Sequence, residues 1–227
     1  MLVTFALAPI IVPQARATRR RALKMEEPLG PREGTGGHGP TMRLLVIGDS
    51  SAAGVGVARQ DEALSGQVLR HLAPHRRVHW TLLARSGATT ADLLSWLPSV
   101  DGPFDSVLLA IGVNDVTRGA TLPRWLVRQR ALLRGLRGLG ARRIVVSGFP
   151  PVHRFPLLPQ PTRWVVGGRA RRFDRARMRL VARTEGAVNL PFEGDLGTEL
   201  MAEDGFHPGP EVYARWGGLA AQALLAG

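Results

Sequence analysis

Short continuous apolar runs mark the chain from residue 42 onwards. Each run is rich in Leu, Val or Ile, which is typical of strands that are buried in a parallel sheet. They lie at residues 43–47, 77–84, 106–111, 143–147 and, more weakly, 187–190.

Longer amphipathic stretches separate these runs. Residues 61–72 carry Leu64, Val68 and Leu72 on one helical face. Further helices are predicted at residues 123–139, 163–184 and 210–225. The alternation of strand and helix predicts an α/β domain whose parallel sheet is covered by helices on both faces.

The first forty residues follow a different pattern. Residues 2–12 are apolar apart from Pro9, and a basic cluster follows, formed by Arg16, Arg19, Arg20, Arg21 and Lys24. Residues 28–40 are rich in Gly and Pro, which indicates a flexible linker. We therefore divide the chain into an N-terminal segment, residues 1–41, and a single α/β domain, residues 42–227.

The N-terminal segment has two interpretations. The apolar run is too short for a helix that crosses about 30 Å of hydrocarbon. It is also unlike a signal peptide, because the positive charge follows the apolar run. We expect a cytoplasmic protein, and one hypothesis for the N-terminal segment is peripheral contact with the anionic surface of the inner membrane. The other is a helix packed on the domain itself.

Charge and composition narrow the function classes. The formal net charge is +12, and all but Lys24 of the 30 basic residues are arginine. A basic chain attracts polyanions, but no nucleic-acid-binding motif is found, and no nucleic-acid partner is expected. The absence of cysteine excludes disulfides, thiolate catalysis and Cys-based metal sites.

Candidate chemistry lies in the turns that follow three of the apolar runs. In parallel sheets, sites form at the carboxyl ends of the strands, so these turns should share one edge. They read Gly48-Asp49-Ser50, Arg85-Ser86-Gly87 and Gly112-Val113-Asn114-Asp115.

An acid and an imidazole lie near the C-terminus, at Asp204 and His207. A serine hydroxyl needs a base within hydrogen-bond reach, and that base needs an orienting acceptor. Ser50, His207 and Asp204 can supply this set. Backbone N–H groups of Ser50 and Gly87 and the side-chain amide of Asn114 can bind the oxyanion that forms during acyl transfer.

Each piece also has an ordinary structural interpretation. Gly-Asp-Ser can begin a helix with a serine cap, Gly87 can be a turn glycine, and Asp204 and His207 can be surface residues. Asp49 and Asp115 are expected to structure their turns. The common order of the pieces, three of them directly after predicted strands, favours chemistry.

In this order the blocks resemble the SGNH hydrolases, the GDS-type serine esterases and lipases. The resemblance spans residues 42 to about 216 and implies a three-layer, flavodoxin-like fold with about five parallel strands. It implies Ser50 as nucleophile, His207 as base, Asp204 as orienter, and Gly87 and Asn114 in the oxyanion hole. One departure is Ser51, where the family usually has leucine. No metal and no cofactor are expected.

Substrate identity is left open by these blocks. The apolar, proline-rich segment 149–164 follows a predicted strand, and Phe149, Pro151 and Phe155 are expected to line an acyl pocket. The expected substrate is a small-molecule or lipid-like carboxylic ester. The alternatives are a carbohydrate O-deacetylase and a non-catalytic membrane or polyanion binder. A nucleotide-binding domain is disfavoured, because the turn after residue 47 lacks the glycine pattern of such domains and has no lysine.

Overall fold

One six-stranded sheet forms the centre of the molecule in the computed structural model, which describes residues 7–21, 25–192 and 198–226. The strand order is β1-β3-β2-β4-β5-β6. Five strands are parallel and β1 is antiparallel to β3. The bounds are β1 (Glu33–Gly36), β2 (Thr41–Gly48), β3 (Arg77–Ala84), β4 (Ser106–Ala110), β5 (Arg143–Ser147) and β6 (Ala187–Leu190).

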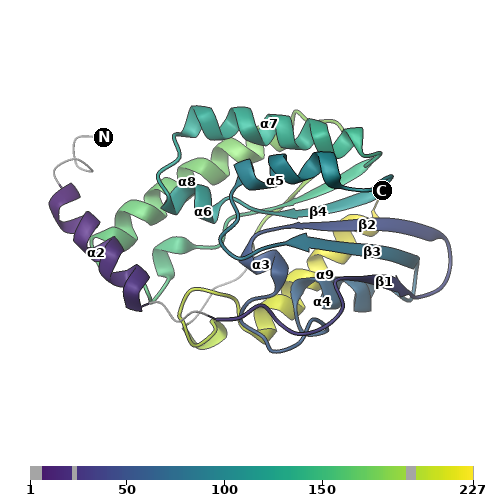
Figure 1. Cartoon of the computed structure of the whole chain (residues 1–227), viewed down its shortest axis with the longest axis horizontal. Helices are drawn as coiled ribbons and strands as arrows, with labels where there is room; N and C mark the ends of the chain where they lie inside the picture. The colour runs from purple at the N-terminus through teal and green to yellow at the C-terminus, as the bar shows by residue number, and fades with distance from the viewer. Residues whose placement is uncertain (1–6, 22–24, 193–197, 227) are drawn as a thin grey trace.

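Helices cover both faces of this sheet, as the strand and helix alternation predicts (Figure 1). One face carries α5 (Thr90–Trp96), α6 (Val113–Thr117), α7 (Leu122–Gly138) and α8 (Thr162–Val181). The other carries α3 (Ser50–Ala53), α4 (Leu64–Leu72) and α9 (Pro210–Leu225). Single 3-10 turns lie at η1 (Leu97–Ser99), η2 (Val152–Arg154) and η3 (Thr198–Leu200). This is a three-layer α/β arrangement, and it confirms the predicted fold class.

The central strand β2 shows why both faces must be covered. Leu44 and Val46 lie in the apolar cluster shared with α4 and α9. Leu45 and Ile47 lie in the cluster shared with α5 and α7 on the opposite face. Alternate residues of a strand point to opposite faces, so an uninterrupted apolar strand is stable only between two helical layers.

The interpretation of residues 28–40 as a flexible linker is wrong. Residues Glu33–Gly36 form β1, which pairs with β3 at the edge of the sheet. Glycine makes this close approach possible, since a Cβ on Gly34 would lie 3.2 Å from Nε1 of Trp80. The fold therefore begins before Met42. Glycine is rare in strands and marks close backbone approach, which is why the composition resembles that of a linker.

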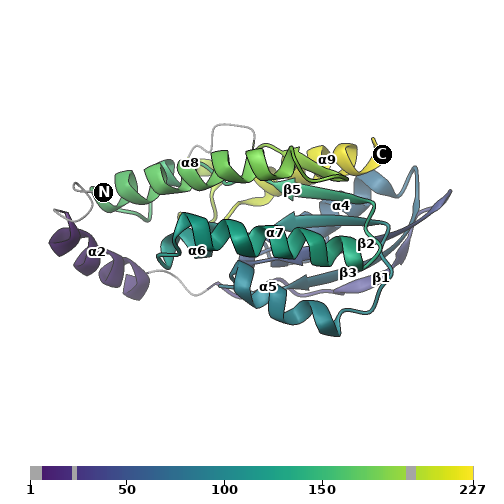
Figure 2. The same cartoon turned by 90° about the horizontal axis from the view of Figure 1, so that it is seen from above.

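The N-terminal helix α2 (Ala8–Arg21) lies beside the start of α8 (Figure 2). Gln14 links the two helices, because its amide nitrogen Nε2 donates to the carbonyl oxygen of Gln160 at 2.7 Å. Its Oε1 accepts from the hydroxyl of Thr162 at 2.7 Å. Within the described ranges, no helix has both the length and the apolar character needed to cross a membrane.

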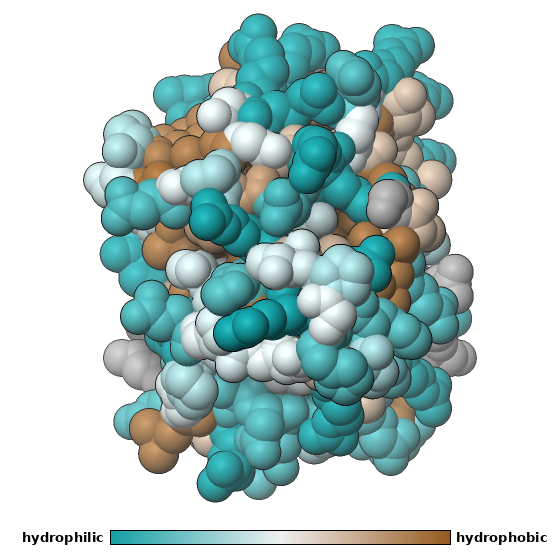
Figure 3. Space-filling model, turned by 90° about the vertical axis from the view of Figure 1, so that its right-hand side faces the viewer, coloured by the Kyte–Doolittle hydropathy of each residue, from teal (hydrophilic) through white to brown (hydrophobic). Residues whose placement is uncertain are grey.

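The two ends of the sheet differ in what they carry. Loops at the carboxyl ends of the strands hold Ser50, Gly87, Asn114 and His207. The opposite end, which faces the viewer in Figure 3, is covered mainly by hydrophilic residues with smaller apolar groups between them.

Candidate active site

The turn after β2 presents a serine at the start of a short helix. Asp49 is the N-cap of α3, and its Oδ1 accepts a hydrogen bond from the backbone N–H of Ser51 at 3.1 Å. This cap orders the turn, as expected for Asp49. Ser50 is then the first residue of α3 and is buried.

Ser50, His207 and Asp204 form one chain of hydrogen bonds. Oγ of Ser50 lies 2.9 Å from Nε2 of His207, and Nδ1 of the same ring lies 2.6 Å from Oδ2 of Asp204. The serine and the histidine are 157 residues apart in the sequence. A hydroxyl, an imidazole and a carboxylate in this order can transfer a proton away from the serine.

Asp204 is held as a carboxylate by its neighbours. Its Oδ1 accepts from the backbone N–H groups of Phe206 at 2.9 Å and His207 at 3.0 Å. Burial acts to raise the pKa of Asp204, but the hydrogen bonds from His207 and Phe206 outweigh it and hold the pKa below its ordinary value. The negative charge that orients the imidazole therefore persists at neutral pH.

Asp49 shows the opposite behaviour. Its carboxyl group is buried and accepts the one hydrogen bond from Ser51 described above. Burial raises the pKa of Asp49 to about 7, although the Ser51 N–H and the nearby His207 act to lower it.

Gly87 and Asn114 lie in the two adjacent turns. Gly87 has a φ of +78°, a conformation that favours glycine. Nδ2 of Asn114 donates to the carbonyl oxygen of Ala88 at 3.0 Å, which ties the two turns together. An amide nitrogen carries two hydrogens, so Asn114 retains a second donor. Asp115 also links elements here, since its Oδ2 accepts from the N–H and the hydroxyl of Thr90.

The three residues expected to line the acyl pocket are divided between two cavities. Phe155 lines the pocket beside Ser50, but Phe149 and Pro151 line a neighbouring cavity of about 200 Å³. The ring of Phe149 is buried and packs against Gly112, where a Cβ would approach it to 2.5 Å. Phe149 therefore packs under the turn that carries Asn114, and Pro150 lines the pocket beside Ser50 in its place.

The pocket at Ser50 is narrow and mostly apolar. Its internal volume is about 30 Å³. Besides the residues already named, it is lined by Val113, Phe192, Met201, Phe206, Pro208 and Trp216. Phe206 lies between Asp204 and His207 in the sequence, so its place beside the catalytic candidates could have been predicted from the motif. Phe192 and Met201 come from loops whose path the sequence pattern does not predict.

We also searched the described residues for side chains that could bind a metal ion. Within the part of the chain that the structure describes, no group of three or more His, Cys, Asp or Glu side chains could hold a metal ion.

Comparisons with known proteins agree with this geometry. Residues 46–215 match the model of the GDSL-like lipase/acylhydrolase family. A curated relative, the GDSL-like esterase Rv1075c of Mycobacterium tuberculosis, is 29% identical over 213 residues. The match covers 84% of this chain and 66% of the relative, so this chain spans about two thirds of its length.

Solved structures share the fold. The psychrotrophic esterase EstA from Pseudoalteromonas sp. has a TM-score of 0.62 at 18% identity, over 81% of this chain and 97% of its own. Est24, a carbohydrate acetylesterase from Sinorhizobium meliloti, has a TM-score of 0.62 at 19% identity, over 82% and 99% of the two chains. The family match covers most of the sequence and includes the turns of Ser50, Gly87, Asn114 and His207. The chain therefore belongs to the GDSL-like lipase/acylhydrolase family.

Proposed function

We propose that the protein is a serine esterase that hydrolyses carboxylic esters through an acyl-enzyme intermediate. The observation that carries this proposal is the hydrogen-bonded chain of Ser50, His207 and Asp204. Membership of a family of lipases and acylhydrolases supports the same reaction class.

The proposed reaction has two halves. Oγ of Ser50 attacks the ester carbonyl carbon while Nε2 of His207 takes the hydroxyl proton. The tetrahedral intermediate collapses, and His207 returns the proton to the departing alcohol. A water molecule, deprotonated by His207, then attacks the acyl-enzyme and releases the acid. Asp204 orients the imidazole and stabilises its charged form.

Negative charge on the carbonyl oxygen must meet fixed donors. We assign this role to the backbone N–H groups of Ser50 and Gly87 and to the second N–H of Asn114. Removal of one such donor typically costs about 3 kcal/mol of transition-state stabilisation.

The pocket favours a small apolar acyl group. The internal volume beside Ser50 is only about 30 Å³, which leaves little room for a long acyl chain. Its apolar side chains suit a short acyl chain, so esters from acetate to butyrate should be hydrolysed faster than octanoate. Acetylated sugars are the second candidate substrate, because an acetyl group suits the same volume.

Replacement of Ser50 tests the assignment. Ser50→Ala should lower kcat on p-nitrophenyl acetate by at least about a thousandfold, because the nucleophile is lost. Ser51→Ala is the matched control at the next residue and should stay within about threefold of wild type. Wild-type turnover by a folded Ser50→Ala protein would refute the proposal, and the reverse ranking of the two serines would identify Ser51 as the nucleophile.

We also propose that α2 contacts an anionic membrane surface. Ile10 and Val12 are about half exposed, at 49% and 47%, and Trp164 in the first turn of α8 is 56% exposed. Arg16 follows on the same helix and is also exposed. Apolar and basic side chains together suit the interface of an anionic bilayer, where tryptophan is enriched.

A further inference from the structure

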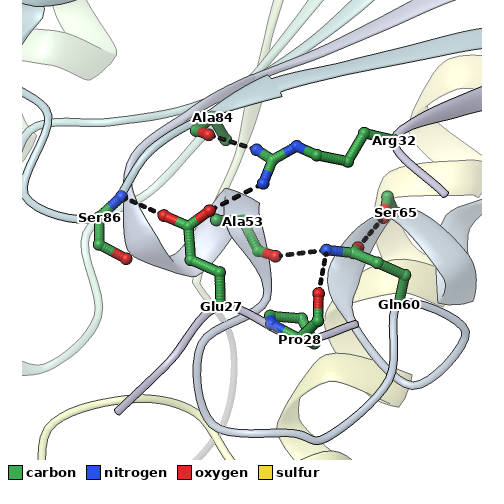
Figure 4. Close-up of polar contacts among 8 residues, drawn as sticks. All are labelled: Glu27, Pro28, Arg32, Ala53, Gln60, Ser65, Ala84 and Ser86. Carbon is green, nitrogen blue, oxygen red and sulfur yellow. Dashed lines mark hydrogen bonds and ion pairs between the residues drawn. The ribbon is translucent and has the colours of Figure 1, made fainter. Parts of the chain in front are cut away.

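A glutamate far from the motifs contacts the turn that carries Gly87. Oε1 of Glu27 accepts a hydrogen bond from the backbone N–H of Ser86 at 2.6 Å. Oε2 of the same carboxylate accepts from Nη1 of Arg32 at 2.7 Å. The other guanidinium nitrogen, Nη2, donates to the carbonyl oxygen of Ala84 (Figure 4). Glu27 and Arg32 thus hold the chain on both sides of Arg85, directly before Gly87.

The segment that carries Glu27 is itself fixed to the helix of Ser50. Nε2 of Gln60 donates to the carbonyl oxygen of Ala53, the last residue of α3, at 2.9 Å. The same nitrogen reaches the carbonyl oxygen of Pro28 at 3.4 Å, and Oε1 of Gln60 accepts from the hydroxyl of Ser65 at 3.0 Å (Figure 4). Gln60 and Ser65 are buried, as is Pro28. The residues 27–32, which we name the strap, therefore bridge α3 and the turn of Gly87.

The turn of Gly87 needs external support. Its own closure is one backbone hydrogen bond, from the N–H of Ala88 to the carbonyl oxygen of Arg85 at 3.1 Å. Arg85 and Ser86 are exposed, and Arg85 is held by its guanidinium over the Trp96 ring, 5.2 Å from the ring centroid, and by its backbone N–H, which reaches the carbonyl oxygen of Gly48 at 3.4 Å. Asn114 secures the far side of the turn through Ala88, and Glu27 secures the near side through Ser86.

We propose that Glu27 is a positioning residue that holds the Gly87 N–H in the oxyanion hole. This inference rests on the proposed function, because it assigns Gly87 as an oxyanion donor. Glu27 does not touch the substrate and acts through Ser86. A donor misplaced by a fraction of an ångström stabilises the transition state poorly, because electrostatic stabilisation depends on donors that are already in position.

The charge on Glu27 contributes to this hold. Hydrogen bonds to an ionised acceptor are shorter and roughly twice as strong as neutral ones. Burial acts to raise the pKa of Glu27, but the hydrogen bonds from Ser86 and Arg32 hold it below its ordinary value. The carboxylate therefore stays charged at neutral pH.

Two variants of Glu27 test the proposal. Glu27→Ala removes both contacts and should lower kcat on p-nitrophenyl acetate about tenfold, with KM within about twofold of wild type. Glu27→Gln keeps the shape and one acceptor, but its amide hydrogens face the donors of Arg32, so kcat should fall at least about threefold. The fall is expected in kcat because the oxyanion exists only in the transition state and the intermediate.

A tetrahedral inhibitor provides a readout that general loss of structure would not mimic. A boronic acid forms a tetrahedral adduct with the serine oxygen, so its affinity reports on the oxyanion donors. Its inhibition constant should rise about as much as kcat falls in each Glu27 variant, while KM stays nearly constant. Glu185→Ala is the matched control, because Glu185 also pairs with one arginine, Arg137 at 3.2 Å, at the opposite end of the sheet. This control should retain wild-type kcat and inhibition.

The outcomes of these experiments decide whether Glu27 has this role. A folded Glu27→Ala protein with kcat within twofold of wild type, or with reduced kcat and unchanged boronate inhibition, overturns the inference. If Glu27→Ala does not fold, Glu27→Gln decides, and unchanged kcat in that variant overturns the inference. Ser50→Ala in the same assay distinguishes a failure of the proposed function from a failure of the role of Glu27. An active Ser50→Ala protein refutes the proposed function. An inactive Ser50→Ala protein together with a fully active Glu27→Ala protein refutes only the role of Glu27.

Discussion

Two carboxyl groups near one imidazole have pKa values shifted in opposite directions. Both carboxyl groups are shielded from solvent, but Asp49 lies deeper than Asp204, and the two also differ in the hydrogen bonds that they accept. Asp204 accepts hydrogen bonds from the ring and the backbone of His207, and these stabilise its charged form. Asp49 receives a single hydrogen bond from Ser51, and burial dominates. Depth of burial and the number of hydrogen-bond donors together decide which carboxyl group remains charged.

Asp49→Asn should therefore change how stability depends on pH. With a folded pKa of about 7 against an ordinary pKa of 3.8 for an aspartate in the unfolded chain, the folded protein binds more protons than the unfolded chain between these two values. Wild-type stability should accordingly fall as pH rises through this window, and asparagine, which is neutral and caps helices well, removes that fall. Urea unfolding at pH 4.5 and 7.5 should show the variant gaining stability over wild type at the higher pH.

Asp204 does not confound this measurement. Its folded pKa is lowered, so its contribution is complete above the unfolded pKa and is lost only as pH falls through the folded pKa, below the window. An Asp49→Asn protein whose stability relative to wild type is the same at both pH values would show that Asp49 does not titrate there.

At the scale of single residues, the sequence predicted the polar site better than its walls. Ser50, His207 and Asp204 stand in motifs, and the structure brings them into hydrogen-bonding contact. Phe149 was misplaced, because an apolar residue after a strand can pack inward or line a pocket, and only the position of Gly112 settles which. Glu27 belongs to no motif, so its contact with Ser86 depends on the path of the chain.

The bounds of helices and strands could be predicted where the element is long or its hydrophobic pattern is clear. β3, β5 and α9 have the predicted bounds, because long amphipathic helices and buried strands leave a clear periodicity; the short strand β6 also has the predicted bounds, although its apolar pattern is weak. The short helices α3, α5 and α6 were missed, since a few residues carry too little periodicity. β1 was missed because two of its four residues are glycine, and its pairing depends on the edge of β3.

The missed strand divides the N-terminal segment into two parts with different roles. Deletion of residues 1–24 removes α2 but keeps the strap and β1. This variant should stay folded and hydrolyse soluble esters at the wild-type rate, but bind vesicles that contain anionic phospholipid more weakly in a sedimentation assay. Wild-type binding should itself weaken as salt screens the basic residues.

Deletion of residues 1–41 is the informative comparison. It also removes β1, Glu27 and Arg32, so thermal stability and kcat should both fall. Equal vesicle binding by wild type and the 1–24 deletion would contradict the membrane proposal. Loss of folding in the shorter deletion would assign α2 to the fold.

At the scale of the whole molecule, the net charge of +12 opposes compaction. Salt screens this repulsion, but it also weakens ion pairs. The exposed pairs, such as Arg59 with Asp61 and Arg215 with Glu211, are each worth about 0–1 kcal/mol. We therefore expect the repulsion to dominate.

Sodium chloride should accordingly stabilise the protein. Raising its concentration from about 10 mM to about 150 mM should raise Tm by about 2–4 °C, equivalent to about 1 kcal/mol. Differential scanning calorimetry measures this shift, with an uncharged osmolyte at equal osmolarity as control. A fall in Tm with added salt would show that the ion pairs outweigh the repulsion.

The separation of Ser50 from His207 has a consequence for synthesis on the ribosome. A growing chain presents Ser50, Gly87 and Asn114 well before residue 207 is translated. His207 lies just before α9, whose packing against α4 completes one face of the sheet. Domains generally fold as units, with the N-terminal part emerging first. A nascent chain would thus hold Ser50 without its contact to His207 until residues 207–225 have emerged and α9 has docked against α4.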